Sequence, residues 1–468
     1  MIGLELMAPL MFAGLIVFVM IGFPVAFSLG AVGLAFAGIA IGEGYFTFNL
    51  MSALPERVFG IMSNELLLAI PFFTFMGAIL ERCGLAEDLL DGIGQLFGPI
   101  RGGLSYAVIL VGAVLGAITG TVAASVIAMG LISLPVMLRY GYSHRHATGV
   151  IAASGTITQL IPPSIVLIVL ADQLGKSVGD MYAGAIGPSL VQILLFCGFV
   201  FLVSMFRPAH VPALPLEART LHGWALIRKC LFGIVPSLAL IFLVLGTILL
   251  GVATPTEGGA MGAVGAMVIA ALHRRLSWTL VRQGMDSTMK ITSMVIFILI
   301  GSNVFSLVFR GVDGDLWIEN LLTALPGGVV GFLVVVNLFV FVLAFFLDFF
   351  EIAFIIIPLL APVAAKLGID LIWFGVLLGA NMQTSFMHPP FGFALFYLRG
   401  IAPKSVRSAD IYWGAIPWVI MQLILVGIVI AFPELVTSFI DGPSTVDPSQ
   451  IQIELPAVEE STAPIEIN

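Results

Sequence analysis

The chain has 468 residues, of which 60% are hydrophobic and only 10% charged, and its mean hydropathy is +1.13 at a net charge of −8. Soluble domains have roughly 45–50% apolar and about 25% charged residues, so this composition excludes a water-soluble fold. No Lys/Arg-rich tract is present, which excludes a nucleic-acid partner. The first apolar segment has no positively charged start, and we expect it to be a retained span rather than a cleaved signal peptide.

Stretches of membrane-crossing length dominate the chain, because a helix needs about 20 apolar residues to cross the hydrocarbon core. We predict ten full spans, five on each side of a polar connector over 207–229. The spans lie near 4–21, 24–42, 65–81, 147–171, 182–206, 231–250, 258–272, 291–309, 371–398 and 411–432. The last stretch, 436–468, is acidic and is predicted to be a solvated tail.

Two further apolar regions do not fit a single span. Region 103–138 is interrupted by Gly116-Ala-Ile-Thr-Gly-Thr121, and region 328–365 by Asp348-Phe-Phe-Glu351. Each is either two spans or a re-entrant hairpin. If both are hairpins, 15 of the 19 Lys and Arg residues fall on one side, which the positive-inside rule makes cytoplasmic. The first hairpin then opens to the cytoplasm, the second opens outward, and both termini lie outside.

The two halves of the chain resemble each other. Asp180-Met-Tyr-Ala-Gly-Ala-Ile186 recurs as Asp410-Ile-Tyr-Trp-Gly-Ala-Ile416, and Pro162-Pro163 recurs as Pro389-Pro390 at an offset of 227. Five spans are an odd number, so the second half must be inverted in the membrane. Inverted repeats are typical of secondary transporters, with the binding site at the repeat interface. We therefore expect an all-α polytopic membrane protein with two inverted repeats, each with a re-entrant helical hairpin and a discontinuous helix. The repeats are 1–206 (hairpin 103–138, broken helix 147–171) and 230–435 (hairpin 328–365, broken helix 371–398).

Helix breakers and hydroxyl groups coincide in the first half. The hairpin tip is Thr119-Gly120-Thr121, and the segment Ser154-Gly-Thr-Ile-Thr-Gln-Leu-Ile-Pro-Pro163 interrupts a membrane helix. Proline frees a carbonyl four residues back, and unwound backbone at membrane depth is tolerated only inside protein or beside a wet cavity. Free carbonyls and hydroxyls are oxygen ligands suited to a hard cation such as Na⁺, and half-helix N-termini attract a carboxylate. The alternative is that these hydroxyls only bond their own helix backbone.

The second half repeats this design with carboxylates. Its hairpin tip is Asp348-Phe-Phe-Glu351, and its broken helix contains Asn381-Met-Gln-Thr-Ser-Phe-Met-His-Pro-Pro390. A carboxylate at membrane depth is costly, so Asp348 and Glu351 are candidates for function, with a structural partner role as the alternative. His388 is either a histidine that completes the helix break or a proton carrier.

These segments resemble the large membrane subunit (M subunit, DctM-like) of tripartite ATP-independent periplasmic, or TRAP, transporters. The matching features are Gly116–Thr121, Ala153-Ser-Gly-Thr-Ile-Thr-Gln-Leu-Ile-Pro-Pro-Ser164, Ala253-Thr-Pro-Thr-Glu257 and the Asp348 hairpin, and the resemblance extends to about residue 435. It implies a Na⁺-driven importer of organic acids in the bacterial inner membrane, with an elevator mechanism like that of the ion transporter superfamily. It also implies two partners, a small four-helix membrane (Q) subunit and a periplasmic solute-binding (P) protein, and no cofactor besides the coupling ion.

By motif position the resemblance implies two Na⁺ regions. The first comprises Thr119, Gly120, Thr121, Ser154, Gly155, Thr156 and Thr158, and the second comprises Asp348, Asn381, Gln383, Thr384 and Ser385. Pro162, Pro163, Glu351, His388, Pro389 and Pro390 remain candidates for substrate binding or coupling.

The chain departs from the family pattern at both hairpin tips. Val122 follows Thr121 where many members have serine, and Phe349-Phe350 follow Asp348 where many have Pro-Thr. His388 stands where a small hydroxyl residue is common. These departures leave a C4-dicarboxylate, a keto acid and other carboxylates open as substrates.

Other classes of function are less well supported. A self-sufficient divalent-anion/Na⁺ symporter of similar fold, which needs no binding protein, is the nearest alternative. An ion channel is the next, but it would not need paired hairpins and broken helices. The chain has no His-Glu-x-x-His, Gly-x-Ser-x-Gly or P-loop motif, so we do not expect an enzyme.

Overall fold

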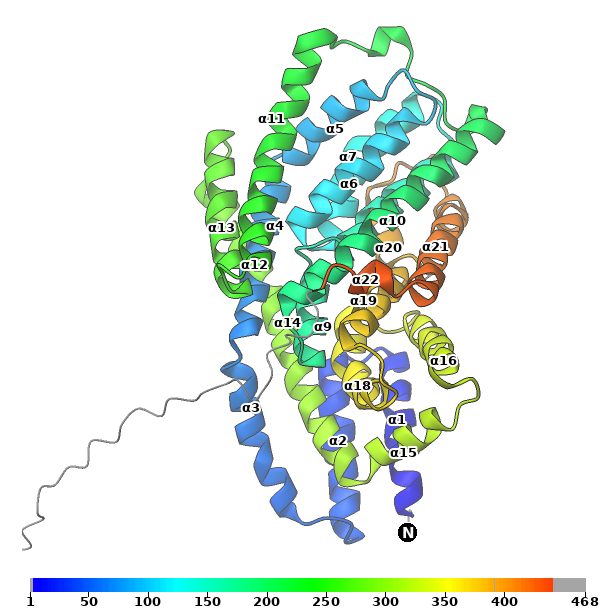
Figure 1. The fold of residues 1–468 in the computed structure, drawn as a ribbon. Helices are drawn as coiled ribbons and strands as arrows, with labels where there is room; N and C mark the ends of the chain where they lie inside the picture. Colours follow the sequence, from blue (N-terminus) through cyan, green and yellow to red (C-terminus); the bar gives the residue numbers. More distant parts are fainter. Residues whose placement is uncertain (1–2, 391, 441–468) are drawn as a thin grey trace, which may run out of the picture.

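The computed structural model describes residues 3–390 and 392–440, and within them the chain forms helices and connecting loops without β-strands (Figure 1). Of the predicted tail 436–468, only the first five residues lie within the described range; the rest lies outside it. Eight helices are long and apolar enough to cross a membrane, and up to 11 if each bent helix pair is one span. An all-α multi-pass fold is therefore confirmed.

The first half runs from α1 to α10. Its elements are α1 (Leu4–Ile21), α2 (Val25–Gly42), η1 (Phe48–Ala53), α3 (Leu54–Met62), η2 (Glu65–Leu68), α4 (Ala69–Arg82), α5 (Leu85–Leu96), α6 (Gly103–Thr119), α7 (Val122–Arg139), α8 (His144–Thr156), η3 (Ile157–Gln159), α9 (Ile165–Leu174) and α10 (Val178–Phe206). The connector that follows contains the short turns η4 (Pro208–His210) and η5 (Leu216–Ala218).

The second half runs from α11 to α22. Its elements are α11 (Gly223–Ile241), η6 (Phe242–Gly246), α12 (Thr247–Leu249), α13 (Pro255–Leu272), α14 (Trp278–Gly311), α15 (Gly314–Thr323), α16 (Gly328–Leu343), α17 (Phe349–Ile355), α18 (Ile357–Lys366), α19 (Leu371–Met382), η7 (Gln383–Phe386), α20 (Phe393–Ile401), α21 (Ser408–Ala431) and α22 (Glu434–Thr437).

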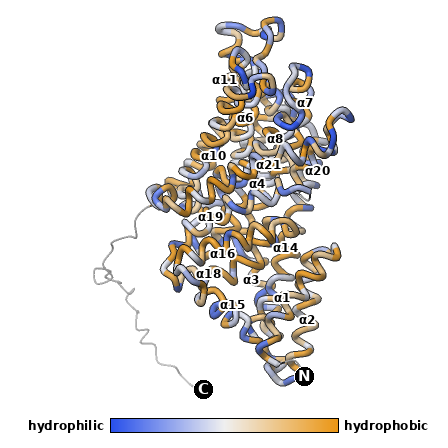
Figure 2. Tube along the Cα trace, turned by 90° about the vertical axis from the view of Figure 1, so that its right-hand side faces the viewer, coloured by the Kyte–Doolittle hydropathy of each residue, from blue (hydrophilic) through white to orange (hydrophobic). Residues whose placement is uncertain are grey.

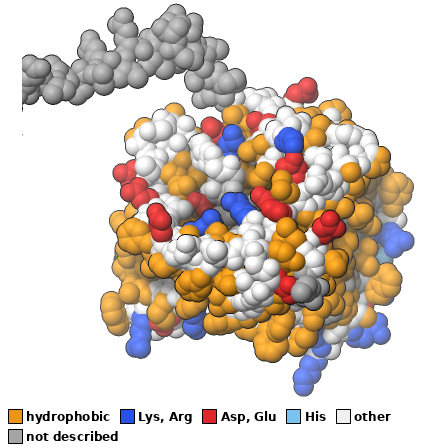
Figure 3. Space-filling model, turned by 90° about the horizontal axis from the view of Figure 1, so that it is seen from below, with side chains coloured by type: hydrophobic (Ala, Val, Ile, Leu, Met, Phe, Trp, Pro, Cys, Tyr) orange, Lys and Arg blue, Asp and Glu red, His pale blue; other side chains and the backbone are white. Residues whose placement is uncertain are grey.

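The outer surface is that of a protein in lipid. Large apolar side chains such as Leu194, Phe232 and Phe297 are more than half exposed on the long helices. Figure 2 shows hydrophobic residues along most of the molecule, with hydrophilic stretches gathered toward its two ends. In Figure 3 charged side chains occupy the middle of the end seen from below, and hydrophobic ones surround them. Soluble monomers rarely expose apolar surface on this scale, because water penalises it.

The first predicted hairpin enters and leaves at one end of the molecule. α6 ends at Thr119, Gly120 takes a left-handed conformation (φ 64°), and α7 starts at Val122. At the open end, Gly102 N donates to Val211 O (2.9 Å), and Ser143 N donates to His210 O (3.0 Å). The residues before α6 and after α7 contact the same connector segment, so both arms open at one end of the molecule, as a re-entrant hairpin or two antiparallel spans would.

The second hairpin is open at the opposite end. Its first arm, α16, follows directly on α15, and Lys366 at the end of its second arm forms an ion pair with Glu319 of α15. In Figure 1 α15 lies at the end of the molecule that carries the start of α1, and the connector before α11 lies at the other end. The two hairpins therefore approach the centre from opposite sides.

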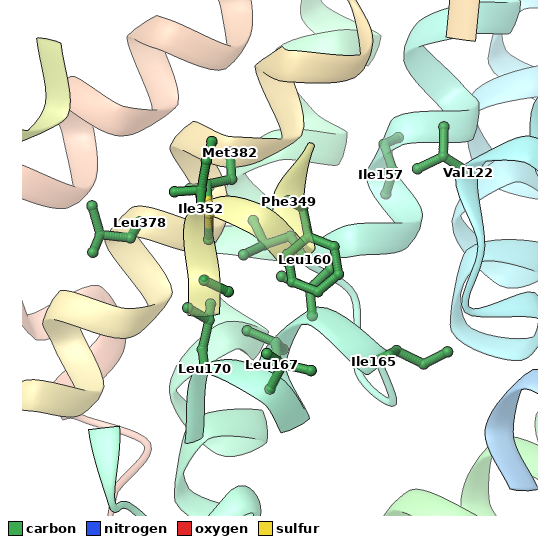
Figure 4. Packing of buried hydrophobic residues seen from close by; sticks show 14 of the residues in the cluster. Val122, Ile157, Leu160, Ile165, Leu167, Leu170, Phe349, Ile352, Leu378 and Met382 are labelled. Atoms are coloured by element: carbon green, nitrogen blue, oxygen red, sulfur yellow. The ribbon is translucent and has the colours of Figure 1, made fainter. Parts of the chain in front are cut away.

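The two broken regions pack together at the centre. Figure 4 shows Phe349 and Ile352 of α17 close to Leu160 and Leu167 from the first half, and to Met382 at the end of α19. All five side chains are almost completely buried. The second hairpin is thus anchored on the first broken helix by apolar contacts, and its tip adjoins the break in the second.

Several elements differ from the predicted spans. The short helices α3, α5 and α15 were not predicted, because their 9, 12 and 10 residues are too few to cross a membrane. α14 has 34 residues and begins at Trp278, well before the predicted span near 291–309. Its first turns carry charged residues, which hydropathy places outside a span although they continue the helix. α11 likewise begins at Gly223, inside the predicted connector.

Candidate functional site

The first broken helix is interrupted where the sequence has its prolines. α8 ends at Thr156, one 3₁₀ turn follows, and α9 begins after Ser164. Ser164 caps α9 by accepting from Val166 N (3.2 Å), and its hydroxyl donates to Gln159 O (2.6 Å). The side chain thereby satisfies polar groups on both sides of the break, which is what an N-cap serine does.

Glycines bring the first hairpin against this break. A Cβ atom added to Gly112 of α6 would lie 2.7 Å from Ser154 Cβ, and one added to Gly116 would lie 2.9 Å from Thr158 Cα. The other arm, α7, is equally close, because a Cβ added to Gly155 of α8 would lie 2.3 Å from Val126 Cγ2 of α7. Only residues without side chains allow the helices to approach this closely, so these glycines place the tip Thr119–Thr121 beside Ser154–Thr158.

The hydroxyls of the first region are buried, except that of Thr121, and most donate to their own helix. The contacts are Ser154 Oγ to Ile151 O (2.9 Å), Thr156 Oγ1 to Ala153 O (2.8 Å), Thr158 Oγ1 to Gly155 O (2.9 Å), and Thr119 Oγ1 with Ser125 Oγ (2.8 Å). This geometry agrees with the alternative that these hydroxyls bond their own helix backbone, but each such bond uses only the hydroxyl proton. Oxygen lone pairs remain, and a cation binds to these.

The second hairpin tip is a reciprocal capping box. Asp348 Oδ1 accepts from Glu351 N (3.0 Å), and Glu351 Oε2 accepts from Asp348 N (2.9 Å). Both carboxylates therefore lie at the start of α17 and both side chains are half-buried. An acidic residue followed three positions later by Glu is a capping-box signature, so the sequence contained this arrangement.

The second break holds polar side chains without hydrogen-bond partners. Asn381 Nδ2 donates to Asn337 O (2.7 Å) and to Asn337 Oδ1 (3.0 Å) on α16, which fixes the amide. Asn381 Oδ1, Thr384 Oγ1 and Ser385 Oγ are buried and have no partner within the described part of the chain. Buried polar groups are normally satisfied, so these three oxygens at one break are available to accept a ligand.

The predicted residues His388 and Gln383 have different surroundings. His388 is buried between the rings of Phe341 and Phe345, with centroid distances of 4.4 and 4.1 Å, and Pro389 and Pro390 follow it. Gln383 is engaged by Gln192 of α10: Gln192 Nε2 donates to Gln383 Oε1 (2.6 Å), and Gln383 Nε2 donates back (3.3 Å). The amide of Gln383 is therefore less available to an ion than Thr384 and Ser385.

Two buried glutamines were missed by the sequence reasoning. Besides Gln192, Gln422 of α21 donates from Nε2 to Thr156 Oγ1 (2.9 Å) in the first break. The signal was present, because Gln192 and Gln422 differ by 230 positions, the offset that relates Asp180 to Asp410. Extending that repeat by six residues, from Ile186 to Gln192 and from Ile416 to Gln422, would have found them.

The fold and these paired breaks define a multi-pass membrane transport protein. The chain belongs to the DctM component family of tripartite ATP-independent periplasmic transporters, whose family model matches residues 12–435. The predicted family is thereby confirmed, and with it a place in the bacterial inner membrane and a transport role rather than an enzymatic one.

Individual relatives agree with this assignment. The chain is 31% identical over 390 residues to the C4-dicarboxylate TRAP transporter large permease protein DctM of Pseudomonas aeruginosa, covering 83% of this chain and 89% of that protein. It is 26% identical over 407 residues to the isethionate TRAP transporter permease protein DctMQ of Oleidesulfovibrio alaskensis, covering 86% of this chain and 61% of that protein.

A solved structure shares the fold. The Alcanivorax borkumensis YdaH transporter superposes with a TM-score of 0.58 at 16% identity, covering 84% of this chain and 90% of that one.

Proposed function

We propose that this chain is the large permease subunit of a Na⁺-driven importer of a small organic acid, and that its hairpins and broken helices move as an elevator. The observation that carries the ion coupling is the set of unpartnered oxygens on Asn381, Thr384 and Ser385. They are neutral, buried and close together in sequence, and Ile352, four residues after Asp348, lies close to Met382 at this break (Figure 4). Oxygen ligands with one carboxylate suit a hard monovalent cation, and Na⁺ would neutralise the charge that the tip carries into the membrane.

The first region would hold a second Na⁺ ion. The proposed ligands of this ion are the hydroxyl oxygens of Thr119, Thr121, Thr156 and Thr158, together with carbonyl oxygens released at the break before Pro162. It lacks a carboxylate among the predicted residues. An ion there would therefore be held by neutral oxygens alone, and we expect it to bind more weakly than the ion at Asp348.

The proposed substrate is an organic anion. The half-helices α9 and α20 begin just after the two breaks, and helix N-termini present unpaired N–H groups and positive dipole ends to anions. The names of the two relatives specify a C4-dicarboxylate and isethionate, which are both small acid anions. A dicarboxylate, a keto acid or a related carboxylate fits the same two half-helices.

The proposed partners are a small membrane subunit and a periplasmic solute-binding protein. This chain spans 61% of the relative called permease protein DctMQ, so that protein contains a large additional part. A second membrane subunit supplied as a separate chain would account for the difference. The binding protein would deliver the anion to the outward-facing side.

Reconstitution in liposomes tests this function. The chain would be incorporated with and without a candidate small membrane subunit and a candidate solute-binding protein, and uptake of a panel of dicarboxylates and keto acids would be measured. We expect uptake only with all three components and an inward Na⁺ gradient. Equal uptake under a proton gradient without Na⁺ would contradict the proposed ion, and full uptake by the chain alone would favour a self-sufficient symporter.

A further inference from the structure

Two hydrogen-bonded contacts cross between the halves at repeat-related positions. Gln192 on α10 of the first half bonds Gln383 in the second break, and Gln422 on α21 of the second half bonds Thr156 in the first break. Gln192 and Gln422 differ by 230 positions, and Thr156 and Gln383 differ by 227, the two offsets that relate the halves elsewhere. All four residues are fully buried. Each long helix thus reaches into the break of the opposite half.

The two contacts differ in what they leave free. In the Gln192–Gln383 pair each amide donates to the other, so each side chain has both a donated and an accepted hydrogen bond. Within the described part of the chain, the side chain of Gln422 has one hydrogen bond, from Nε2 to the Thr156 hydroxyl, whose own proton goes to Ala153 O (2.8 Å). Gln422 Oε1 is buried and has no partner within the described residues.

The position of this free oxygen is fixed by the bond that the same amide makes. Nε2 and Oε1 share one carbon atom, so holding Nε2 against the Thr156 hydroxyl keeps Oε1 at the first break. Gln159 Oε1, three residues after Thr156, is also buried without a partner. Amide oxygens are ligands that hard cations accept, and an isolated buried one is costly unless something binds it.

We propose that Gln422 is an ion ligand of the first Na⁺ region, supplied by the opposite half, and that its counterpart Gln192 only positions the second break. The inference rests on the proposed Na⁺ coupling and adds a residue to it. The first region would then be a site shared by the two halves. Na⁺ bound there would contact both α8 and α21, so ion binding would depend on how the two halves pack.

Na⁺-dependent thermal unfolding of the purified full chain tests this without a transport assay. A ligand that binds only the folded state raises its stability with concentration, so the Na⁺ midpoint of the shift in melting temperature reports affinity. Choline replaces Na⁺ at constant ionic strength. The variants are Gln422→Met, which keeps length but removes the oxygen, and Gln422→Glu, whose one oxygen can accept from the Thr156 hydroxyl while the other stays free for the ion. Gln192→Met is the matched control at the repeat-related position.

We expect Gln422→Met to raise the Na⁺ midpoint about fivefold, the effect of losing one neutral contact. Gln422→Glu should restore the response, and Gln192→Met should lower the melting temperature without Na⁺ yet move the midpoint less than about twofold. An unchanged midpoint in Gln422→Met overturns the inference, as do equal shifts in both methionine variants or a Gln422→Glu protein that behaves like Gln422→Met. A wild-type chain without any Na⁺ shift would overturn the proposed function as well.

Discussion

Asp348 combines a structural and a proposed electrostatic role in one side chain. Its Oδ1 caps α17 through Glu351 N, and its charge lies at a tip inside the membrane. Asparagine is as good an N-cap as aspartate, so Asp348→Asn should keep the helix start while removing the charge. An ionised carboxylate at membrane depth costs roughly 2.5–3.5 kcal/mol, and Na⁺ binding is the proposed compensation. We expect normal expression but loss of Na⁺-driven uptake, measured with radiolabelled substrate in proteoliposomes.

Two further variants serve as controls for this prediction. Asp348→Ala removes the cap as well and should cost about 1 kcal/mol of stability in addition. Glu351→Gln keeps an oxygen that can accept from Asp348 N, so the capping box survives and the effect on uptake should be milder. A dead Glu351→Gln protein beside an Asp348→Asn protein with unchanged Na⁺ dependence would move the ion assignment to Glu351.

Thr121 and Thr156 separate an ion-binding role from a structural one. The Thr121 hydroxyl has no hydrogen bond within the described residues, whereas Thr156 joins Ala153 O and Gln422. Thr121→Ala should therefore leave the melting temperature unchanged, yet raise the Na⁺ concentration for half-maximal uptake about fivefold, equivalent to about 1 kcal/mol. Thr156→Ala should raise this Na⁺ concentration too and should also lower the melting temperature, because it leaves Gln422 Nε2 without a partner. Unchanged Na⁺ activation curves in both variants would show that these hydroxyls are only structural.

At the scale of the elements, glycines decide how closely the first hairpin packs. Gly112→Ala places a methyl group 2.7 Å from Ser154 Cβ, so α6 and α8 must move apart. Overpacking of this kind typically costs about 1–3 kcal/mol, and we expect a lower melting temperature. Gly198→Ala on α10 is the control, because a Cβ there meets nothing within 4 Å. If both variants melt alike, the hairpin does not depend on close contact at Gly112.

The elements that sequence predicted are those with a strong apolar or helix-breaking signal. Apolar length located the spans, and the prolines at Pro162 and Pro389 located the breaks within a few residues. The helices α3, α5 and α15 were not predicted, because hydropathy does not separate short amphipathic helices from loops. The Gln192–Gln383 and Gln422–Thr156 contacts depend on which helices meet across the halves. Side-chain pairing over more than 190 positions is set by tertiary packing and leaves no local pattern.

At the scale of the whole molecule, the opposed hairpins make a topology prediction. Ser143 lies at the open end of the first hairpin, on the side where most Lys and Arg residues fall, and Lys176 lies in an exposed turn after α9. In a variant without Cys83, Cys197 and Cys230, a cysteine at 143 should react with an impermeant maleimide only from the cytoplasm, and one at 176 only from the periplasm. Labelling of position 143 from the periplasm would contradict the hairpin orientation.

The elevator proposal predicts that a bond between the moving and fixed parts stops transport. Asn64, which precedes η2 and α4, donates to Asp172 Oδ1 of α9 (2.8 Å), and thus joins a remaining span to the first broken helix. If α9 moves relative to α4 during transport, this contact must break in every cycle. In the cysteine-free background, Asn64→Cys with Asp172→Cys, bridged by a short bifunctional thiol reagent that a reductant cleaves, should lose uptake and recover it on reduction. Each single-cysteine variant treated in the same way should retain uptake, which separates crosslinking from modification. Full uptake by the bridged double variant would show that these two elements keep their positions, and a fixed-site mechanism would replace the elevator.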